Sequence, residues 1–419
     1  MNSITINSKL VSDYRIEYEY EIKGEWKKNF TQKKFYVEYS HSINSINDSI
    51  AIIPILGTVL PMSWLFNAQV KVNEIDKMFF EAIPDFKRGY ENMYPQLSFG
   101  GNLVVDHIVE NKNSANKSAA MFSGGVDAFN TLISHIVEKP DIITIWGADI
   151  AVSNDEGWSV VEKHRDEVAK KWDLGAVTVK SSFREAVNEE ELSRYILRSV
   201  NESWWHGFHH SIGMFALVAP VAYCRNYSHL YIASSFTADY IGKYTCASDP
   251  TIDNFVKFCG CSVVHDGYEF NRQEKIHNIC EYSSIHNVKI PLRVCWESTG
   301  GSNCCKCEKC LRTMMGIYAE KKDITDFGFS CKKIDNYILR KMLGQCFANA
   351  KTAIMRYECI QKRMRENYSK NEIDTSLRWF YKTDVDKLIK RFKWEYKLKG
   401  NILRIIHKIE KLFGIKVIR

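Results

Sequence analysis

Residues 119–132 constrain the fold of this chain more than any other stretch. A short apolar run at 119–122 leads into the turn Ser123-Gly124-Gly125, and apolar residues then recur at helical spacing from Val126 to Ile136. Adjacent glycines leave backbone amides uncovered by side chains, and the N-terminus of a helix attracts anions. The segment therefore predicts a strand, a turn and a helix that together can bind phosphate oxygens. A strand–helix junction without a ligand is the plain alternative, because such junctions are common in α/β folds.

The chemistry of this turn comes from a few side chains and amides. Ser123 supplies a hydroxyl, and Asp127 supplies a carboxylate in the first helical turn, where it can cap the helix or help to hold a metal ion. The patterns G-x-x-x-x-G-K-[ST] and G-x-G-x-x-G are both absent from the chain. The candidate nucleotide-binding residues here are Ser123, Gly124, Gly125, Val126 and Asp127.

Strand-like and helix-like segments alternate after the turn, which predicts an α/β fold with a parallel sheet and helices on both of its faces. The predicted strands lie at 142–146, 176–179, 230–233 and 261–265, and the predicted helices at 159–172, 189–200 and 204–223.

The predicted strand ends carry further polar residues. In open α/β sheets, ligands bind at the carboxyl ends of strands near the switch in strand order. Asp149, Ser234 and Ser235 follow predicted strands and join the Ser-Gly-Gly turn at this edge. Asp239 and Asp249 lie further along and are candidate metal or ribose contacts. A cap or turn role is the alternative for each aspartate.

The sequence predicts three domains of different character. Residues 1–110 are predicted to form a β-rich domain, with alternating strands at 14–22 and 34–39 and an apolar, β-branched strand at 50–60. A helix at 72–93 and a strand at 103–109 follow. Residues 111–330 are predicted to form the nucleotide-binding domain, and residues 331–419 a helical extension.

The composition is that of a globular chain of more than one domain, with 419 residues of which 45% are apolar. The N-terminus lacks the charged start and apolar core of a signal peptide. The longest uncharged stretch, 49–66, contains Pro54, Gly57 and Pro61, so we expect buried strands and turns there rather than a bilayer span. The expected location is the cytoplasm.

The positive charge is concentrated in the C-terminal tail. Residues 381–419 hold 12 Lys or Arg and four Asp or Glu, which is +8 and leaves the rest of the chain near −1 of the total +7. Apolar residues at helical spacing within 402–413 predict an amphipathic helix. Such a helix can lie on an anionic membrane surface at the inner face, or pack on the protein itself or on a biosynthetic partner. No nucleic-acid partner is expected, because no RNA-binding module is recognisable.

Four of the 13 cysteines follow the spacing C-x8-C-x2-C-x2-C. In a reducing compartment, clustered cysteines are more often metal ligands or catalytic groups than disulfides. A closed four-sulfur site is the pattern of structural zinc, and an iron–sulfur cluster is the main alternative. Gly300 and Gly301 allow the chain to turn between the first two ligands. The predicted ligands are Cys295, Cys304, Cys307 and Cys310.

Together, the turn and the cysteines resemble those of the PP-loop ATP pyrophosphatases, the adenine-nucleotide α-hydrolase superfamily. The S-G-G-x-D-[ST] signature of that superfamily matches at the four residues Ser123, Gly124, Gly125 and Asp127. It departs at Ala128, where the superfamily has Ser or Thr, so one hydroxyl contact to phosphate is missing.

Two families within the superfamily are similar to different parts of this chain. The cysteine spacing and residues 234–244 resemble the 7-cyano-7-deazaguanine synthase family. The segment His265-Asp266-Gly267, with Arg272 and Lys275, is similar to the ATP-dependent UDP-N-acetylmuramoyl-L-alanyl-L-glutamate epimerase group.

This resemblance implies that ATP is cleaved between its α and β phosphates, which gives an adenylylated substrate and pyrophosphate. ATP, Mg²⁺ and structural Zn²⁺ are the implied cofactors. Asp127 would support the loop or the metal, and Arg272 and Lys275 would neutralise charge on the leaving group from one side of a helix. A solvated helix face is the alternative for that pair.

Three histidines, His206, His209 and His210, have the spacing of one helix face. His209 is the candidate general acid or base, and a packed core histidine is the alternative.

The implied substrate is a small or nucleotide-linked molecule whose carboxylate or carbonyl oxygen is adenylylated, with an epimerase-like or ligase-like outcome. Resemblance favours a cell-wall or surface-glycan precursor. A nucleobase or tRNA-modification reaction of the deazaguanine-synthase or thiolation type is the alternative among enzymes. A catalytically inactive nucleotide-binding scaffold is the other alternative, which Ala128 keeps open.

Overall fold

The computed structural model describes residues 1–295, 302–349 and 353–413. The chain divides into two compact units, Met1–Glu269 and Phe270–Arg419. The predicted domain boundaries near 110 and 330 stay a prediction.

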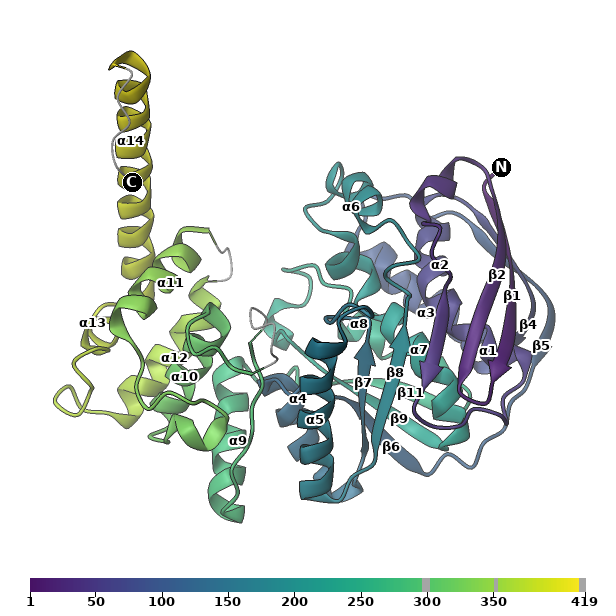
Figure 1. Ribbon diagram of the computed structural model, residues 1–419, viewed down its shortest axis with the longest axis horizontal. Coiled ribbons are helices and arrows are strands. Elements are labelled where there is room, and N and C mark those ends of the chain that lie inside the picture. The colour runs from purple at the N-terminus through teal and green to yellow at the C-terminus, as the bar shows by residue number, and fades with distance from the viewer. Residues whose placement is uncertain (296–301, 350–352, 414–419) are drawn as a thin grey trace. The chain divides into compact units, whose positions relative to one another are not determined.

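The first unit is built on one sheet of eleven strands in the order β10-β11-β9-β6-β7-β8-β3-β2-β1-β4-β5. Figure 1 shows these strands with their helices. The strands are β1 (Ser3–Ser12), β2 (Arg15–Lys23), β3 (Tyr36–Tyr39), β4 (Gln69–Asp76), β5 (Asn102–Val109), β6 (Lys117–Met121), β7 (Asp141–Trp146), β8 (Ala176–Ser181), β9 (Tyr227–Ala233), β10 (Lys257–Phe258) and β11 (Cys261–Asp266).

The sheet is mixed and mostly parallel, which confirms the α/β fold class. Strands β11, β9, β6, β7 and β8 are parallel neighbours. The N-terminal strands continue the same sheet, because β3 pairs antiparallel with β8 through Val37 and Ser181. The N-terminal segment therefore adds strands to the edge of the parallel region.

The strand order reverses direction at β6. From β6 the chain proceeds to β7 and β8 on one side, and then returns to place β9 and β11 on the other side. The carboxyl ends of β6 and β9 therefore flank the switch point, where open α/β sheets bind ligands.

The prediction of a strand at 50–60 is wrong. Helices α1 (Asp48–Ala51) and α2 (Ile53–Leu65) occupy this segment, and every residue of α2 is buried. A helix that is apolar on all sides shows no periodicity to separate it from a buried strand. Pro54 lies in the first turn, where a helix tolerates proline, although Pro61 lies further inside.

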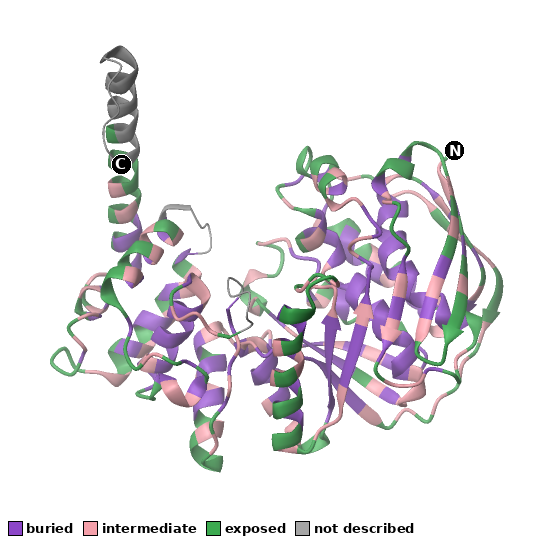
Figure 2. Cartoon of the chain, viewed as in Figure 1, coloured by how far each residue is buried: buried purple, intermediate pink, exposed green. Residues whose placement is uncertain are grey.

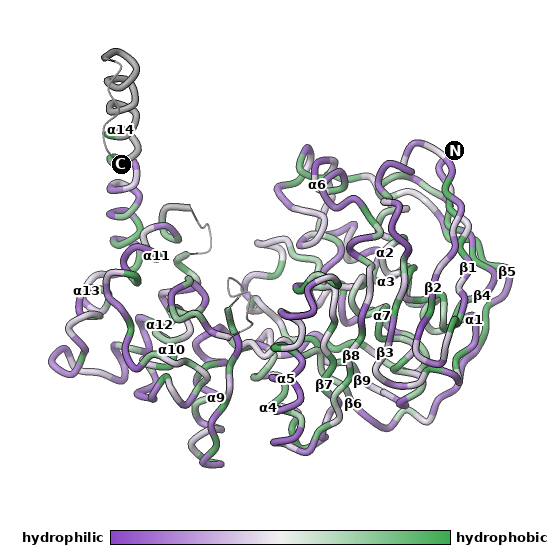
Figure 3. Tube along the Cα trace, viewed as in Figure 1, coloured by the Kyte–Doolittle hydropathy of each residue, from purple (hydrophilic) through white to green (hydrophobic). Residues whose placement is uncertain are grey.

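A second apolar helix, α7 (Ile212–Cys224), packs against α2 in the core. Gly57 permits the close approach, because a Cβ at this position would lie 2.4 Å from the Ala216 Cβ. Figure 2 shows α7 and the neighbouring central strands as mainly buried. Figure 3 shows the same elements as mainly hydrophobic.

Other predicted elements are confirmed with shifted ends. The helix predicted at 72–93 begins only at Lys77, because residues up to Asp76 belong to β4, and Asp76 caps α3 (Lys77–Met93) by accepting a hydrogen bond from the Phe79 amide. The remaining helices of the first unit are α4 (Val126–Ser134), α5 (Asp155–Trp172), α6 (Glu189–Leu197) and α8 (Pro250–Asp253). Residues Trp205–His209 form a π-helical turn, so the helix predicted at 204–223 is divided in two.

The regular elements of the second unit are helices, and no strand occurs among its described residues. Its helices are α9 (Arg272–His286), α10 (Glu308–Ala319), α11 (Asn336–Asn349), α12 (Ala353–Asn367), α13 (Arg378–Lys382) and α14 (Val385–Phe413). Of the predicted apolar stripe on the tail, Ile402 is exposed, and the residues from 403 onward lie outside the described side chains. No helix in the described ranges is both long and apolar enough to cross a membrane.

Candidate functional site

The Ser-Gly-Gly turn lies at the carboxyl end of β6, directly before α4. Gly124 has φ +77°, which side chains rarely adopt, whereas Gly125 is extended (φ −78°, ψ 174°) and serves as the N-cap of α4. A Cβ at Gly125 would meet only the Ser123 Oγ, at 3.4 Å. One glycine is therefore required by the backbone, and the other leaves space in front of the amides at the helix N-terminus.

Hydrogen bonds to the neighbouring strand β7 fix the start of the turn. The Phe122 amide donates to the Ile143 carbonyl at 2.7 Å, and the Thr144 hydroxyl donates to the Phe122 carbonyl at 2.8 Å. These bonds carry the pairing of β6 and β7 one residue past the strand, so the turn leaves the sheet at a defined point.

The side chains of the turn divide between solvent and core. Ser123 is exposed and accepts a hydrogen bond from the Gly125 amide at 3.4 Å, while Asp127 is partly buried in the first turn of α4. Val126 and Ala128 are buried. Ser123 and Asp127 therefore supply the polar side chains of the turn.

The other strand-end candidates lie after β7 and β9. Asp149 is exposed in the loop after β7, and Ser235 is exposed after β9. Ser234 is buried, with its amide donating to the Asp266 carbonyl at 2.9 Å and its hydroxyl donating to the Phe236 carbonyl at 2.5 Å. Ser234 thus holds the end of β9 against the end of β11.

The two aspartates further along are placed differently from each other. Asp239 is exposed in a 3₁₀ turn, Ala238–Tyr240. Asp249 is buried and caps α8, because its carboxylate accepts from both the amide and the hydroxyl of Thr251. This is the capping role that the sequence left open for Asp249, and contacts to ribose or metal stay a prediction for both residues.

Asp266, at the end of β11, connects that strand to α4. Its carboxylate accepts from the Thr131 hydroxyl at 2.6 Å and contacts His135 Nε2 at 2.9 Å. Burial lowers the pKa of His135, but hydrogen bonds to Asp266 and Glu138 outweigh it and raise that pKa. The C-terminal part of the helix that follows the Ser-Gly-Gly turn is therefore connected to the end of β11.

Arg272 and Lys275 belong to the second unit, whereas the turn belongs to the first. Arg272 begins α9 and is partly buried, and Lys275 is buried one turn later. The burial of Lys275 does not fit a solvated helix face. A role for this pair at the leaving group stays a prediction.

His209 lies in the core of the first unit. It has no exposed surface, its Nε2 pairs with the Thr58 hydroxyl at 2.9 Å, and its ring packs on Phe183 and Trp204. Burial lowers the pKa of His209, against the effect of Glu189. This is the packed histidine that the sequence left as an alternative, and a catalytic role stays a prediction.

In the second unit, the sulfur atoms of Cys295, Cys304, Cys307 and Cys310 all lie within 4.8 Å of one another. The Cys295–Cys307 and Cys304–Cys310 pairs are 3.8 and 3.9 Å apart. A tetrahedral zinc ion with bonds of about 2.3 Å has sulfur–sulfur edges of about 3.8 Å. The four cysteines can therefore hold a single structural metal ion such as zinc. An iron–sulfur cluster would separate the thiolates further, because they bind to different iron atoms of the cluster.

Local hydrogen bonds prepare this cluster. Asn303 accepts from the amides of Val294 and Cys295 and donates to the carbonyls of Leu292 and Gly328. Cys307 is the N-cap of α10, and its amide donates to the Cys304 sulfur at 3.2 Å. Asn303 thus joins the two chain segments that supply the ligands. Gly300 and Gly301, predicted to allow tight turning, lie outside the described residues.

Without a metal ion, Cys307 and Cys310 keep their protons at neutral pH. Burial raises the pKa of Cys307 to about 11 and raises that of Cys310 further. Metal binding must therefore displace protons from the cluster, which makes the affinity depend on pH.

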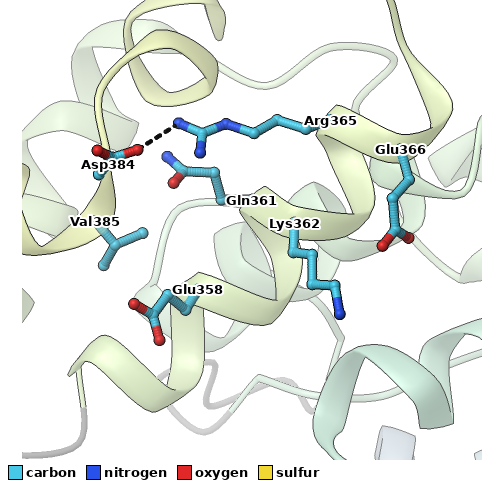
Figure 4. A pocket seen from close by; sticks show the side chains of 7 residues that line it. All are labelled: Glu358, Gln361, Lys362, Arg365, Glu366, Asp384 and Val385. Atoms are coloured by element: carbon cyan, nitrogen blue, oxygen red, sulfur yellow. Dashed lines mark hydrogen bonds and ion pairs between the residues drawn. The ribbon is translucent and has the colours of Figure 1, made fainter.

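A pocket on the second unit lies between α12 and the start of α14 (Figure 4). Arg365 Nη2 and Asp384 Oδ1 pair across it at 3.0 Å. It contains none of the site residues predicted from the sequence, so it contributes nothing to the candidate site. Its lining residues are Glu358, Gln361, Lys362, Arg365, Glu366, Asp384 and Val385.

Sequence reasoning passed over two residues of the first unit, Glu202 and Cys246, which lie next to His206. No motif marks them, because they are separated by 44 positions in the chain. The only sequence feature that could have indicated them is the position of Cys246 in a polar turn close to Asp249.

Comparisons with protein-family models, with curated proteins and with solved structures find no match for this chain.

Proposed function

We propose that this protein binds ATP at the Ser-Gly-Gly turn and cleaves it to AMP and pyrophosphate, so that a carboxylate or carbonyl oxygen of a small or nucleotide-linked substrate is adenylylated. The observation that carries this proposal is the position of the turn. It follows β6 at the switch in strand order and leads into the N-terminus of α4. The backbone amides of the turn, the space left by Gly125 and the positive end of the α4 dipole then all lie at the same site, in front of the N-terminus of α4.

The side chains of the turn are suited to an anionic ligand that carries a metal ion. Ser123 supplies an exposed hydroxyl, and Asp127 supplies a carboxylate that would hold Mg²⁺ or support the loop. Mg²⁺ takes carboxylate oxygen and phosphate oxygen together, which is how it would join Asp127 to the nucleotide. The four cysteines would bind structural zinc and take no part in the reaction.

The substrate class rests on resemblance, not on geometry. The segment around His265-Asp266-Gly267 is similar to the epimerase group, so a cell-wall or surface-glycan precursor is the proposed substrate. Peripheral contact of the basic tail with an anionic membrane or with a biosynthetic partner belongs to the same proposal.

Gly125→Ala tests the turn with little disturbance of the fold. Alanine adopts φ −78° without strain, and its Cβ meets only Ser123 at ordinary contact distance. The methyl group would nevertheless cover the amides that bind phosphate. We expect nucleotide affinity to fall roughly tenfold or more, since each lost contact to a charged group is worth about 1.5–3 kcal/mol. Calorimetric titration with ATP and Mg²⁺ measures this loss, and an unchanged melting temperature verifies folding.

Asp127→Asn tests the carboxylate, with Asp48→Asn as the matched control. Both aspartates lie in the first turn of a helix, and Asp48 is exposed at the start of α1. With α-labelled ATP, Mg²⁺ and a panel of acceptors, we expect AMP formation to fall roughly 10²–10³-fold in Asp127→Asn and to stay unchanged in the control. ATP that binds at the turn without any turnover across the panel would favour an inactive scaffold. Loss of turnover in both variants would contradict the proposed site.

A further inference from the structure

A buried thiol, Cys246, lies in the loop between the 3₁₀ turn at 238–240 and α8. It lines a pocket together with Ser234 from the end of β9 and His265 from β11. The pocket therefore opens at the same edge of the sheet as the switch point. Its remaining lining residues are Phe236, Thr237, Tyr240, Ile241, Tyr244, Ser248, Asp249, Pro250 and Tyr268.

Two imidazoles face this thiol. His206 lies in the π-helical turn and His210 directly follows it, four residues apart, and both imidazoles lower the pKa of the Cys246 thiol. The Ala247 amide donates to the His206 carbonyl at 2.8 Å, which binds the cysteine loop to the histidine turn. Among the described residues, His210 Nδ1 is buried and has no hydrogen-bond partner.

Glu202 orients the first of these imidazoles. Its Oε2 contacts His206 Nδ1 at 2.7 Å, and its Oε1 accepts from the Thr245 hydroxyl at 2.6 Å. Because Nδ1 pairs with the carboxylate, Nε2 is the ring nitrogen left for Cys246. The side chains thus form a carboxylate–imidazole–thiol series, the arrangement that activates a nucleophile through a base held by a third group.

Electrostatics favour an ion pair at neutral pH. Burial alone raises the pKa of Cys246, but hydrogen bonds from His206 and then His210 lower it to about 7. Hydrogen bonds to Cys246 and to Glu202 raise the pKa of His206 to about 10. A thiolate is the reactive form of cysteine, and an imidazolium beside it is the proton donor.

Besides the titratable groups that line the pocket, two tyrosines lie near Cys246, one on α3 and one directly after it. Tyr90 and Tyr94 have pKa values raised chiefly by burial, so both phenols are neutral. Their hydroxyls donate to the Phe208 and Gly207 carbonyls in the π-helical turn. They hold the turn in place and add no charge.

We propose that Cys246 is a nucleophile that takes up an activated acyl group as a thioester, with His206 as the acid and base and Glu202 as a positioning residue. The Cys246 Sγ attacks the acyl carbon, a carbon–sulfur bond forms, and the bond from that carbon to the leaving oxygen breaks with its electron pair on the oxygen. His206, no longer beside a thiolate, releases its proton to the leaving group or to solvent. The neutral imidazole then takes a proton from an incoming water or amine, which attacks the thioester and restores the thiolate.

The cavity itself is small, about 10 Å³, so its lining side chains would have to move apart to admit an acyl group with a polar end. Aromatic rings of Phe236, Tyr240 and Tyr244 line one part, whereas His265 and Asp249 bring polar groups. The buried Asp253 carboxylate holds His265 Nδ1 at 2.7 Å, so the His265 imidazole has a fixed orientation. An acyl adenylate is the class of compound that would supply the acyl group. Only this choice of acyl donor rests on the proposed function; the roles of Cys246, His206 and Glu202 do not.

The first test uses p-nitrophenyl acetate with the full-length protein and no ATP, so its result does not depend on nucleotide chemistry. We expect a burst of p-nitrophenolate of about one equivalent, and an acetyl group on Cys246 that hydroxylamine releases. Mapping the label by mass spectrometry on the unaltered protein avoids dependence on how well Cys246→Ala folds. Acetylation spread over several cysteines, or absent from Cys246, would overturn the proposal.

The second test measures the burst rate against pH in His206→Gln, with His229→Gln as the matched control. Both histidines are exposed, and His229 lies on β9. We expect the midpoint of the rate profile near pH 7 in the native protein and in the control, and roughly 1–2 pH units higher in His206→Gln. An unchanged midpoint in His206→Gln would remove His206 from the proposal. A normal burst in protein that does not cleave ATP would leave Cys246 in place and refute only the proposed source of the acyl group.

Discussion

The two units use cysteine in opposite ways. In the second unit, four thiols converge within 4.8 Å of one another, and burial raises the pKa of Cys307 to about 11. In the first unit, one thiol faces two imidazoles, which lower the pKa of Cys246 to about 7. Thiols surrounded by other thiols keep their protons until a cation replaces them, whereas a thiol beside imidazoles transfers its proton to a neighbour. The partner, more than the degree of burial, decides the chemistry.

This difference also separates a local site from a long-range one. The cysteine ligands lie within 16 consecutive positions, so their spacing already predicts a metal site. His206 and Cys246 are 40 positions apart, and only the packing of the cysteine loop on the π-helical turn brings them together.

Cys307→Ser should give the largest effect. We expect loss of the bound metal and a decrease in the unfolding free energy of the second unit on the order of 3–5 kcal/mol, part of the roughly 10–16 kcal/mol that a structural zinc ion contributes. Metal analysis by mass spectrometry and denaturant unfolding measure both quantities.

Cys280→Ser is the control for this change. Cys280 is also buried in the second unit, on α9, but lies outside the cluster. It should keep one equivalent of metal and lose only about 1 kcal/mol. Native protein with less than half an equivalent of zinc would refute the zinc assignment, and full stability in Cys307→Ser would contradict a structural role.

Alkylation with iodoacetamide should distinguish the two kinds of thiol. In metal-free protein at pH 8, most Cys246 is thiolate and almost no Cys307 is, because their pKa values lie on opposite sides of this pH. We expect Cys246 to react roughly tenfold faster or more, since the lower nucleophilicity of a low-pKa thiolate offsets part of its greater abundance. The rate at Cys246 should fall as the pH falls through about 7. Equal rates at both positions, mapped by mass spectrometry, would show that the two thiols do not differ in protonation.

Glu202→Gln should give the smallest effect. The amide can still hydrogen-bond to His206 and Thr245, but it removes the negative charge that helps to raise the pKa of His206. We expect the pH midpoint of Cys246 alkylation to rise by roughly half a unit to one unit, less than in His206→Gln. Glu190→Gln, at an exposed carboxylate on α6, is the control. A midpoint that does not move would show that Glu202 has no electrostatic role at this thiol.

The sequence predicted many of the strands well, because alternating segments and turn residues mark them locally. The strands predicted at 14–22, 103–109, 142–146 and 261–265 all occur, with ends shifted by a few residues. The segment at 50–60 was predicted wrongly, because a fully buried helix shows neither helical nor strand periodicity. The contact between Gly57 on α2 and Ala216 on α7 that stabilises it spans more than 150 positions.

By itself, the sequence determined the features whose parts are neighbours in the chain. These are the strand–turn–helix at Ser123-Gly124-Gly125, the cysteine spacing and the basic tail. Backbone conformation and ligand spacing act over a few residues, so a local pattern can specify them.

Only the tertiary structure decided which side chains meet. It placed the turn at the switch in strand order, buried His209 in the core, and brought Glu202, His206 and Cys246 together. Such encounters depend on the packing of whole elements, and the energy of packing comes from contacts between residues far apart in the chain.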